Sequence, residues 1–204
     1  MRRDGHERAW VLHTRPWRET SLLLELFTPE SGRIGVVARG ARRPRRGSRA
    51  LEAFVAVRCA LSGRGELRTL GSHEVIERAP LAGDALYAGF YLNELLVRLL
   101  QREDAHARLF REYEGALAVL AKLPRGSDAI ALEPVLRRFE FALLDELGYG
   151  LPLAEDLDGA PVDPERRYLV EPDAGVRPVL PGVAEQDDDR ALQIGGAELL
   201  AIAE

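Results

Sequence analysis

The spacing of apolar residues changes abruptly at Pro80. From residue 9 to about residue 78, short apolar runs rich in Val, Leu, Ile, Phe and Trp alternate with turn residues such as those at 28–32 and 62–65, a pattern typical of β-strands. After Pro80, apolar residues recur every three or four positions, as in amphipathic helices. The chain is therefore expected to fold as an α+β protein, with strands first and helices second.

Five apolar runs of this kind precede Pro80. They are AWVLHTR, TSLLLELFT, GRIGVVARG, LEAFVAVRCAL and GELRTLGSHEVI. Five short strands at regular spacing are typical of a small antiparallel sheet that closes, or nearly closes, into a barrel, because closure removes exposed strand edges. We therefore expect residues 1–79 to form a five-stranded β-barrel domain, with Trp10 and Phe27 in the core.

Residues 80–204 are expected to form a mainly helical domain. Pro134 is acceptable only in the first turn of its helix, and Gly148 suits a C-terminal end. Beyond Gly150 the chain is acidic and rich in turn residues. The expected helices lie at about 84–101, 105–123 and 132–147, followed by an irregular hairpin and loop region at about 151–190 and a short helix at about 195–204.

The composition excludes several other classes of protein. Cys59 is the only cysteine, which leaves neither a disulfide framework nor a Cys-x-x-Cys zinc pair. The four histidines are far apart in the sequence, so we expect no metal and no cofactor. No apolar run approaches the roughly 18 residues that span a membrane, and the N-terminus lacks the apolar segment of a signal peptide. A cytoplasmic protein without membrane contact is expected.

Positive charge is concentrated in the first part of the chain. Residues 1–78 contain 16 basic and 9 acidic side chains, whereas residues 79–204 contain 12 and 24, so a net charge of +7 precedes one of −12. This asymmetry favours a polyanion as partner of the basic part. The stretch RGARRPRRGSR, between the third and fourth expected strands, contributes Arg39, Arg42, Arg43, Arg45, Arg46 and Arg49. Arginine suits phosphate; the alternative is a solvated loop without a ligand.

Four sequence blocks occur in a characteristic order: AWVLHTRPWRETSLLLELFTPESGRIGVVARGAR, SGRGELRTL, GFYLNELLVRLL and PVLRRFEFALLDELGYG. Together they resemble the RecO family of bacterial recombination mediators and DNA-annealing proteins. The resemblance implies an oligonucleotide/oligosaccharide-binding (OB) barrel followed by a helical domain. It also implies a nucleoid-associated role in the RecF pathway, with RecR as a partner, in loading recombinase onto strands coated by single-strand DNA-binding protein.

Two features differ from many members of that family. The chain has no four-cysteine zinc module after the expected helices, so it resembles the zinc-free type, with residues around 158–180 in that place. Family members usually continue into a basic C-terminal helical segment, whereas this sequence stops at Glu204. That segment would contribute DNA affinity or seal the helical bundle.

Barrels of this type bind single strands by stacking bases on aromatic side chains in a positively charged groove. Trp17, with Arg15 and Arg18 beside it, is the candidate stacking platform, and Arg33 is expected to extend the basic surface. The alternative is that Trp17 covers one end of the barrel. Nothing resembles a base-reading helix, so binding to single- and double-stranded DNA is expected to be independent of sequence.

Two arginines interrupt an otherwise apolar run in the third expected helix. The resemblance implies the C-terminal tail of single-strand DNA-binding protein as a ligand, and such an acidic tail needs an apolar pocket with cations at its mouth. The candidate residues are Tyr91, Leu109, Phe110, Arg137, Arg138 and Phe141. The alternative is that the arginines lie on a solvated face or pair with Glu133 and Glu140 or Glu146.

The sequence contains no recognised catalytic motif. Walker, GxSxG, HExxH and dinucleotide-binding patterns are absent, and the run of residues 187–189, all aspartate, is typical of a solvated linker. We therefore expect strand annealing without nucleotide hydrolysis. The alternative function is a protein-interaction adaptor whose barrel docks RecR or another protein, with the basic loop as its docking arm.

Overall fold

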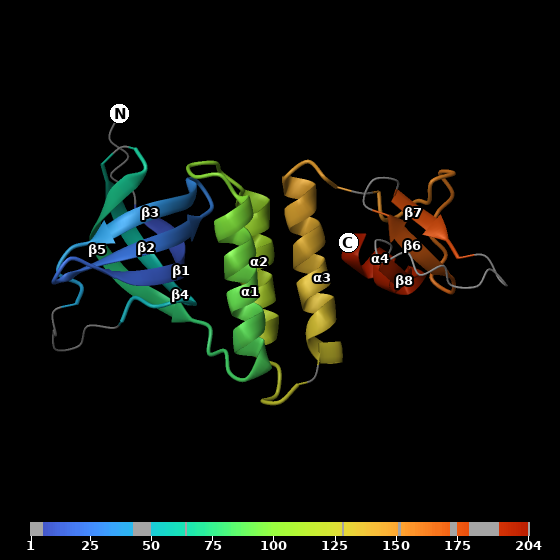
Figure 1. Ribbon diagram of the computed structural model, residues 1–204, viewed down its shortest axis with the longest axis horizontal. Helices are drawn as coiled ribbons and strands as arrows, with labels where there is room; N and C mark the ends of the chain where they lie inside the picture. The colour runs from blue at the N-terminus through green and yellow to red at the C-terminus, as the bar shows by residue number, and fades with distance from the viewer. Residues whose placement is uncertain are drawn as a thin grey trace. The chain divides into compact units, whose positions relative to one another are not determined.

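The computed structural model describes residues 6–42, 50–63, 65–127, 129–150, 152–171, 175–179 and 192–203 (Figure 1). The chain divides into two compact units, residues 1–139 and 140–204. The change from strands to helices comes at about residue 79, as expected from the sequence, but the first unit continues well beyond it. The strands and the first two helices therefore belong to one compact body.

A closed five-stranded barrel opens the first unit. Its strands are β1 (Glu7–Trp17), β2 (Ser21–Thr28), β3 (Gly32–Ala38), β4 (Val55–Ser62) and β5 (Leu67–Arg78), in the order β1-β2-β3-β5-β4. All neighbouring strands are antiparallel except β3 and β5, which run parallel where residues 35–37 pair with residues 67–69. The purely antiparallel sheet expected from the sequence is wrong at this pair, because β4 pairs antiparallel with both β1 and β5.

Alternation along the strands gives the barrel an inner and an outer apolar face. The inner core contains residues such as Leu24, Ile34 and Val57, each almost fully buried. Trp10 and Phe27 are also buried, which confirms their expected core position. They lie on the outer face, however, and pack against the helices rather than inside the barrel.

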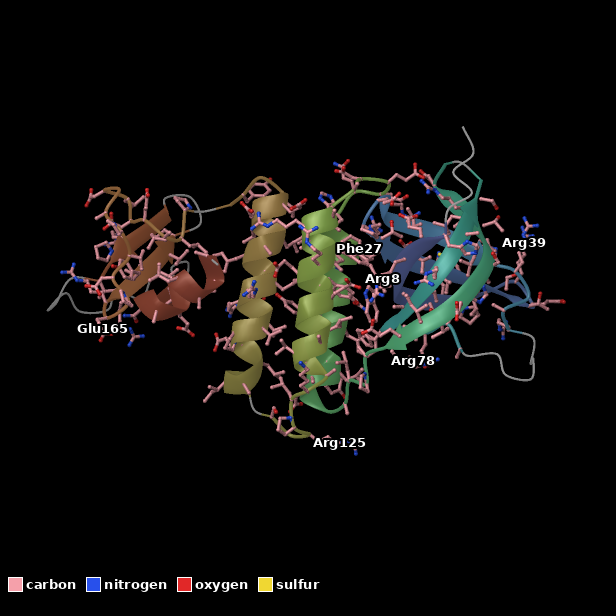
Figure 2. All side chains as sticks on the ribbon, turned by 180° about the vertical axis from the view of Figure 1, so that it is seen from behind. Arg8, Phe27, Arg39, Arg78, Arg125 and Glu165 are labelled. Atoms are coloured by element: carbon pink, nitrogen blue, oxygen red, sulfur yellow. The ribbon has the colours of Figure 1, made fainter. Side chains whose placement is uncertain are left out.

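Helices α1 (Asp84–Leu99) and α2 (Ala107–Leu120) pack on this outer face. The ring centroids of Phe27 and Phe110 are 5.4 Å apart, and those of Trp10 and Tyr113 are 6.2 Å apart. Figure 2 shows Phe27 on the side of the barrel that faces the helices. Aromatic contacts of this kind make the barrel and the two helices one cooperative core.

The connection between α1 and α2 docks against β3. Arg102 forms a parallel β-bridge with Arg33, and the Glu103 amide donates a 3.0 Å hydrogen bond to the Arg33 carbonyl. Gly32 has φ 63°, and a Cβ added there would collide with the carbonyl oxygen of Asp104. The close approach of this loop to the barrel therefore requires glycine at position 32.

Helix α3 (Ala129–Glu146) begins in the first unit and ends in the second. The second unit also contains β6 (Arg167–Glu171), β7 (Gly175–Pro178), β8 (Leu192–Gly195) and α4 (Gly196–Ala203). The three strands form one sheet in the order β7-β6-β8 around a small core that includes Tyr168. Strand β8 was not expected, because its four residues are too few to show a period. None of the described helices is long and apolar enough to cross a membrane.

Candidate nucleic-acid interface

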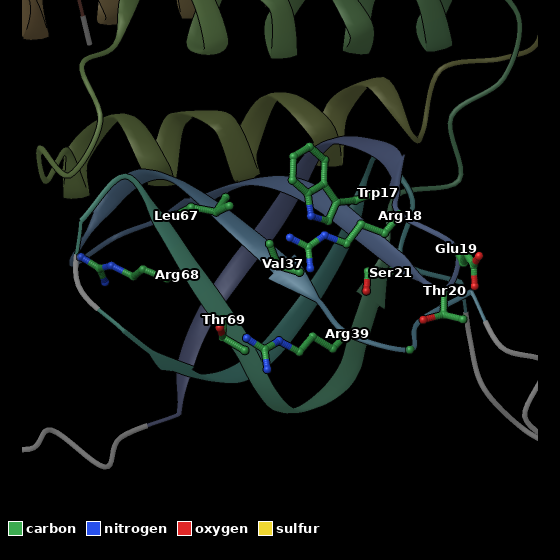
Figure 3. A pocket seen from close by; sticks show the side chains of 11 residues that line it. Trp17, Arg18, Glu19, Thr20, Ser21, Val37, Arg39, Leu67, Arg68 and Thr69 are labelled. Carbon is green, nitrogen blue, oxygen red and sulfur yellow. The ribbon is translucent and has the colours of Figure 1, made fainter.

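A groove of about 740 Å³ lies on the outer face of the barrel, where the β1–β2 turn meets the ends of β3 and β5. Figure 3 shows its lining from close by. The lining residues are Trp17, Arg18, Glu19, Thr20, Ser21, Val37, Arg39, Gly40, Leu67, Arg68 and Thr69. The groove therefore combines an aromatic ring, short polar side chains and several cations, with one carboxylate.

The β1–β2 turn presents Trp17 to this groove. Trp17 pairs with Ser21 at the last rung of the β1–β2 ladder, so that only residues 18–20 connect the two strands. Arg18 has φ 52°, in the left-handed region that residues other than glycine and asparagine rarely adopt. The Trp17 side chain is 36% exposed. An exposed indole on a strained turn is an unusual feature of the outer face.

Two arginines, Arg18 and Arg39, line the same groove. In Figure 3, the guanidinium groups of Arg18 and Arg39 both extend over the floor formed by Val37 and Thr69. Within the described part of the chain, neither side chain has a hydrogen bond or ion pair to a carboxylate. Their charges are therefore available to a phosphate group.

Arg42 has a supporting role in this surface. Its Nη1 donates hydrogen bonds of 3.2 Å to the carbonyls of both Arg18 and Glu19, and its amide donates to the Thr20 carbonyl at 3.0 Å. Arg42 thus holds the β1–β2 turn in place. Arg15 is exposed on β1, two residues before Trp17, and does not line the groove. Arg43, Arg45, Arg46 and Arg49 lie outside the described residues.

Arg33 does not extend the basic groove surface. Its Nε and Nη2 donate to the Leu100 carbonyl at 3.1 and 2.9 Å, and its Nη1 lies 3.3 Å from Glu25 Oε2. The side chain is only 14% exposed. Arg33 instead binds the carbonyl at the end of α1 and so connects that helix to the barrel. The sequence did not indicate this contact, because Leu100 is 67 residues away from Arg33.

The residues expected to bind an acidic peptide differ in exposure and in their charged partners. Leu109 and Phe110 are core residues, so the expectation that they line an open pocket does not hold. Tyr91 is 39% exposed on α1. Arg137 lies 3.5 Å from Glu133 and Arg138 lies 3.1 Å from Glu112. The Arg137–Glu133 pair is one that the alternative named, whereas Arg138 pairs with Glu112 of α2.

The last member of that expected set, Phe141, belongs to the second unit. There it packs against the core cluster that contains Leu153 and Tyr168. Its ring is therefore used to join α3 to the small sheet of that unit.

Other groups that carry chemistry are few. Among the described residues, no group of three His, Cys, Asp or Glu side chains could hold a metal ion. Cys59 is fully buried, and burial, with a smaller effect from the charge of Glu7, raises the pKa of its thiol to about 12. This thiol is therefore a neutral core residue.

The groove floor was missed by the sequence reasoning. Val37, Leu67 and Thr69 come from strands that are 30 residues apart, and only the parallel β3–β5 pairing brings them together. Arg102 was also missed, because only the docking of the α1–α2 loop on β3 brings it next to Gly35. No local pattern signals a pairing between strands so far apart in the chain.

A closed five-stranded barrel with this strand order defines the class of OB-fold proteins. Residues 1–79 match the family model "Recombination protein O N terminal", and residues 81–194 match "Recombination protein O C terminal". The chain belongs to the RecO family of DNA repair proteins.

Individual relatives agree with this assignment along nearly the whole chain. DNA repair protein RecO of Stutzerimonas stutzeri (strain A1501) is 45% identical over 203 residues, which cover 98% of this chain and 78% of the relative. DNA repair protein RecO of Laribacter hongkongensis (strain HLHK9) is 44% identical over 198 residues, covering 96% and 76%. The similarity therefore includes both the barrel and the helical part.

Proposed function

We propose that this protein binds single-stranded DNA, independently of sequence, in the groove between the β1–β2 turn and the β3–β5 floor. The observation that carries the proposal is the exposed indole of Trp17 beside Arg18 and Arg39, neither of which pairs with a described carboxylate. OB barrels bind oligonucleotides on the same face, through strands 2 and 3 and the loop between strands 1 and 2. The groove position supports the same use here.

The chemistry of the lining suits a single strand. A base can stack on Trp17 whatever its identity, because every base has a π-face. The planar guanidinium groups of Arg18 and Arg39 can donate paired hydrogen bonds to phosphate oxygens. The lining contains no described array of amide side chains that would distinguish bases. Binding is therefore expected to depend on the backbone and on stacking rather than on sequence.

This mode of binding supports a mediator role in recombination. Neutralising phosphates on two strands lowers the repulsion between them and releases condensed counterions, so complementary strands can anneal without nucleotide hydrolysis. We propose that the protein anneals strands in this way and helps to load recombinase onto strands coated by single-strand DNA-binding protein, with RecR as partner.

Fluorescence anisotropy of a labelled single-stranded oligonucleotide across a salt series tests the proposal. We compare the parent with the double variant Arg18→Ala/Arg39→Ala. The matched control is Arg111→Ala/Arg125→Ala, which removes the same charge from exposed arginines of the helical part. The groove variant should bind more weakly, with a salt slope shallower by about 1.4, because each lost contact on a single strand contributes about 0.7.

The result also separates DNA binding from an adaptor role. If the groove variant and the control bind DNA as the parent does, the groove serves something other than DNA, and a barrel that docks a protein gains support. A further variant, with Arg43, Arg45 and Arg46 changed to alanine, measures the contribution of the arginine-dense stretch to the same salt slope and keeps the contacts of Arg42 to the β1–β2 turn.

A further inference from the structure

Arg102, from the loop between α1 and α2, lies on the same outer face of the barrel as the groove. A Cβ added to Gly35 would lie 3.1 Å from Arg102 Nη1, so the guanidinium group occupies the space where a side chain at position 35 would lie. Gly35 and Val37 are two residues apart on β3 and therefore point to the same face. Gly35 also pairs with Leu67, another groove residue.

Arg33 and Arg102 share one carboxylate, that of Glu25. Glu25 is 14% exposed, and its two carboxylate oxygens accept separately from Arg33 and Arg102. Two guanidinium groups thus share one carboxylate, which gives the cluster a net charge of +1. The Nε and Nη2 of Arg33 donate hydrogen bonds to the Leu100 carbonyl.

Arg102 also keeps unused hydrogen-bond donors. Guanidinium carries five N–H groups; Arg102 donates through Nη2 to Glu25 and through Nη1 to the Glu66 carbonyl. The other N–H groups have no acceptor among the described residues, and the side chain is 36% exposed. Arg102 is consequently oriented by two partners while it can still bind a third.

We propose that Arg102 is a further phosphate-binding residue of the groove, and that glycine at position 35 leaves the space that its guanidinium group occupies. The inference rests on the proposed function and extends the bound strand from Trp17 across Val37 and Leu67 to the helical part of the chain. Two residues along a strand span roughly 7 Å, so Arg102 follows Val37 at a separation that a neighbouring nucleotide can bridge.

The loop does not depend on Arg102 alone for its position. The Glu103 amide bonds to the Arg33 carbonyl, and Arg33 bonds to the Leu100 carbonyl, without the Arg102 side chain. A variant that lacks this side chain is therefore expected to keep the loop docked. This makes a test of DNA binding possible without loss of the fold.

The test compares Arg102→Ala with Arg98→Ala in the same salt-series anisotropy experiment. Arg98 is an exposed arginine on α1, paired with Glu94 at 2.6 Å, and its loss removes the same charge close by. Arg102→Ala should make the slope shallower by about 0.7 and lower the affinity about five-fold at 0.1 M salt, as expected for one lost phosphate contact. Arg98→Ala should match the parent.

Two more variants separate contact from general charge and from folding. Arg102→Lys keeps the charge and should retain the slope with intermediate affinity, because it lacks the planar fork. Gly35→Ala displaces the guanidinium group without changing charge and should weaken binding. Thermal melting shows whether Arg102→Lys and Gly35→Ala fold as the parent does. If Arg102→Ala does not fold, the DNA affinities of these two variants test the proposal instead.

The outcomes distinguish the two proposals. If Arg102→Ala and Arg98→Ala bind equally while Arg18→Ala/Arg39→Ala is weakened, Arg102 only anchors the loop and this inference is overturned. If the parent does not bind DNA, or if the groove variant binds as the parent does, the proposed function fails and this inference fails with it.

Discussion

The Tyr113 hydroxyl donates a 2.5 Å hydrogen bond to Asn93 Oδ1, and the Asn93 amide donates a 2.8 Å hydrogen bond to the Leu12 carbonyl. All three residues are buried. Leu12 lies where the β1–β2 register shifts between Val11 and His13, so it has no partner in that ladder. Asn93 of α1 therefore supplies the hydrogen-bond donor for the carbonyl of the bulged residue Leu12, and Tyr113 of α2 fixes the orientation of the Asn93 side chain.

Removal of this network should destabilise the first unit. Asn93→Leu leaves the Leu12 carbonyl and the Tyr113 hydroxyl buried without partners, which costs about 2–4 kcal/mol, and Tyr113→Phe costs about 1–2 kcal/mol. The double variant should cost less than the sum, because it also removes the orphaned hydroxyl. Urea unfolding of the three variants measures these differences; strictly additive costs would show that the two residues are not coupled.

Stability should fall in alkaline solution. Burial raises the pKa of Tyr113 above its ordinary range, and burial with the nearby Glu7 raises that of Cys59 to about 12. In the unfolded chain these groups lose protons near pH 10 and 8.5, so above those values the unfolded state binds fewer protons and the free energy of unfolding decreases with pH. Urea unfolding between pH 8 and 10.5 tests this, and Cys59→Ala/Tyr113→Phe should flatten the slope.

Two glycines with similar backbone angles should respond differently to alanine. Gly32 has φ 63° and faces the Asp104 carbonyl, whereas Gly40 has φ 66° and nothing within 4 Å of an added Cβ. Gly40→Ala should cost about 1 kcal/mol from left-handed strain alone. Gly32→Ala should cost at least about 2 kcal/mol more, because the docked loop must move. Equal melting temperatures for the two variants would argue against tight docking of the loop.

Arg18→Gly should separate stability from binding. Its left-handed backbone suits glycine, so the variant should gain about 0.5–1 kcal/mol in free energy of unfolding. It also loses a groove cation and should bind single-stranded DNA more weakly. Thermal melting and anisotropy on the same preparation measure both effects. A variant that binds DNA as well as the parent would remove Arg18 from the proposed surface.

Trp17 should report binding directly by its fluorescence. A base stacked on its exposed ring should quench it, whereas the buried Trp10 should not respond. Trp17→Ala should lower the affinity about 5- to 150-fold, since stacking contributes about 1–3 kcal/mol per base, and Trp17→Phe should retain most of the affinity. The proposed platform is wrong if the quenching persists in Trp17→Ala.

Much of the fold follows from local patterns in the chain. Short apolar runs bounded by turn residues predicted the five strands, and apolar residues at every third or fourth position predicted α1 to α3, because both signals depend only on neighbouring residues. The four-residue strand β8 shows no such period. The sequence also predicted Trp17, Arg18 and Arg39 as site residues, and the structure places all three in one groove.

The sequence by itself determined which chemical groups are available: an aromatic ring in the first turn, a cluster of arginines and a basic first half. The tertiary structure decided which of them face the groove. The parallel pairing of β3 with β5 brings Val37 next to Thr69, and loop docking turns Arg33 inward while it lays Arg102 over Gly35. The orientations of these side chains depend on contacts between residues about 30 to 70 positions apart, and local periodicity does not encode such contacts.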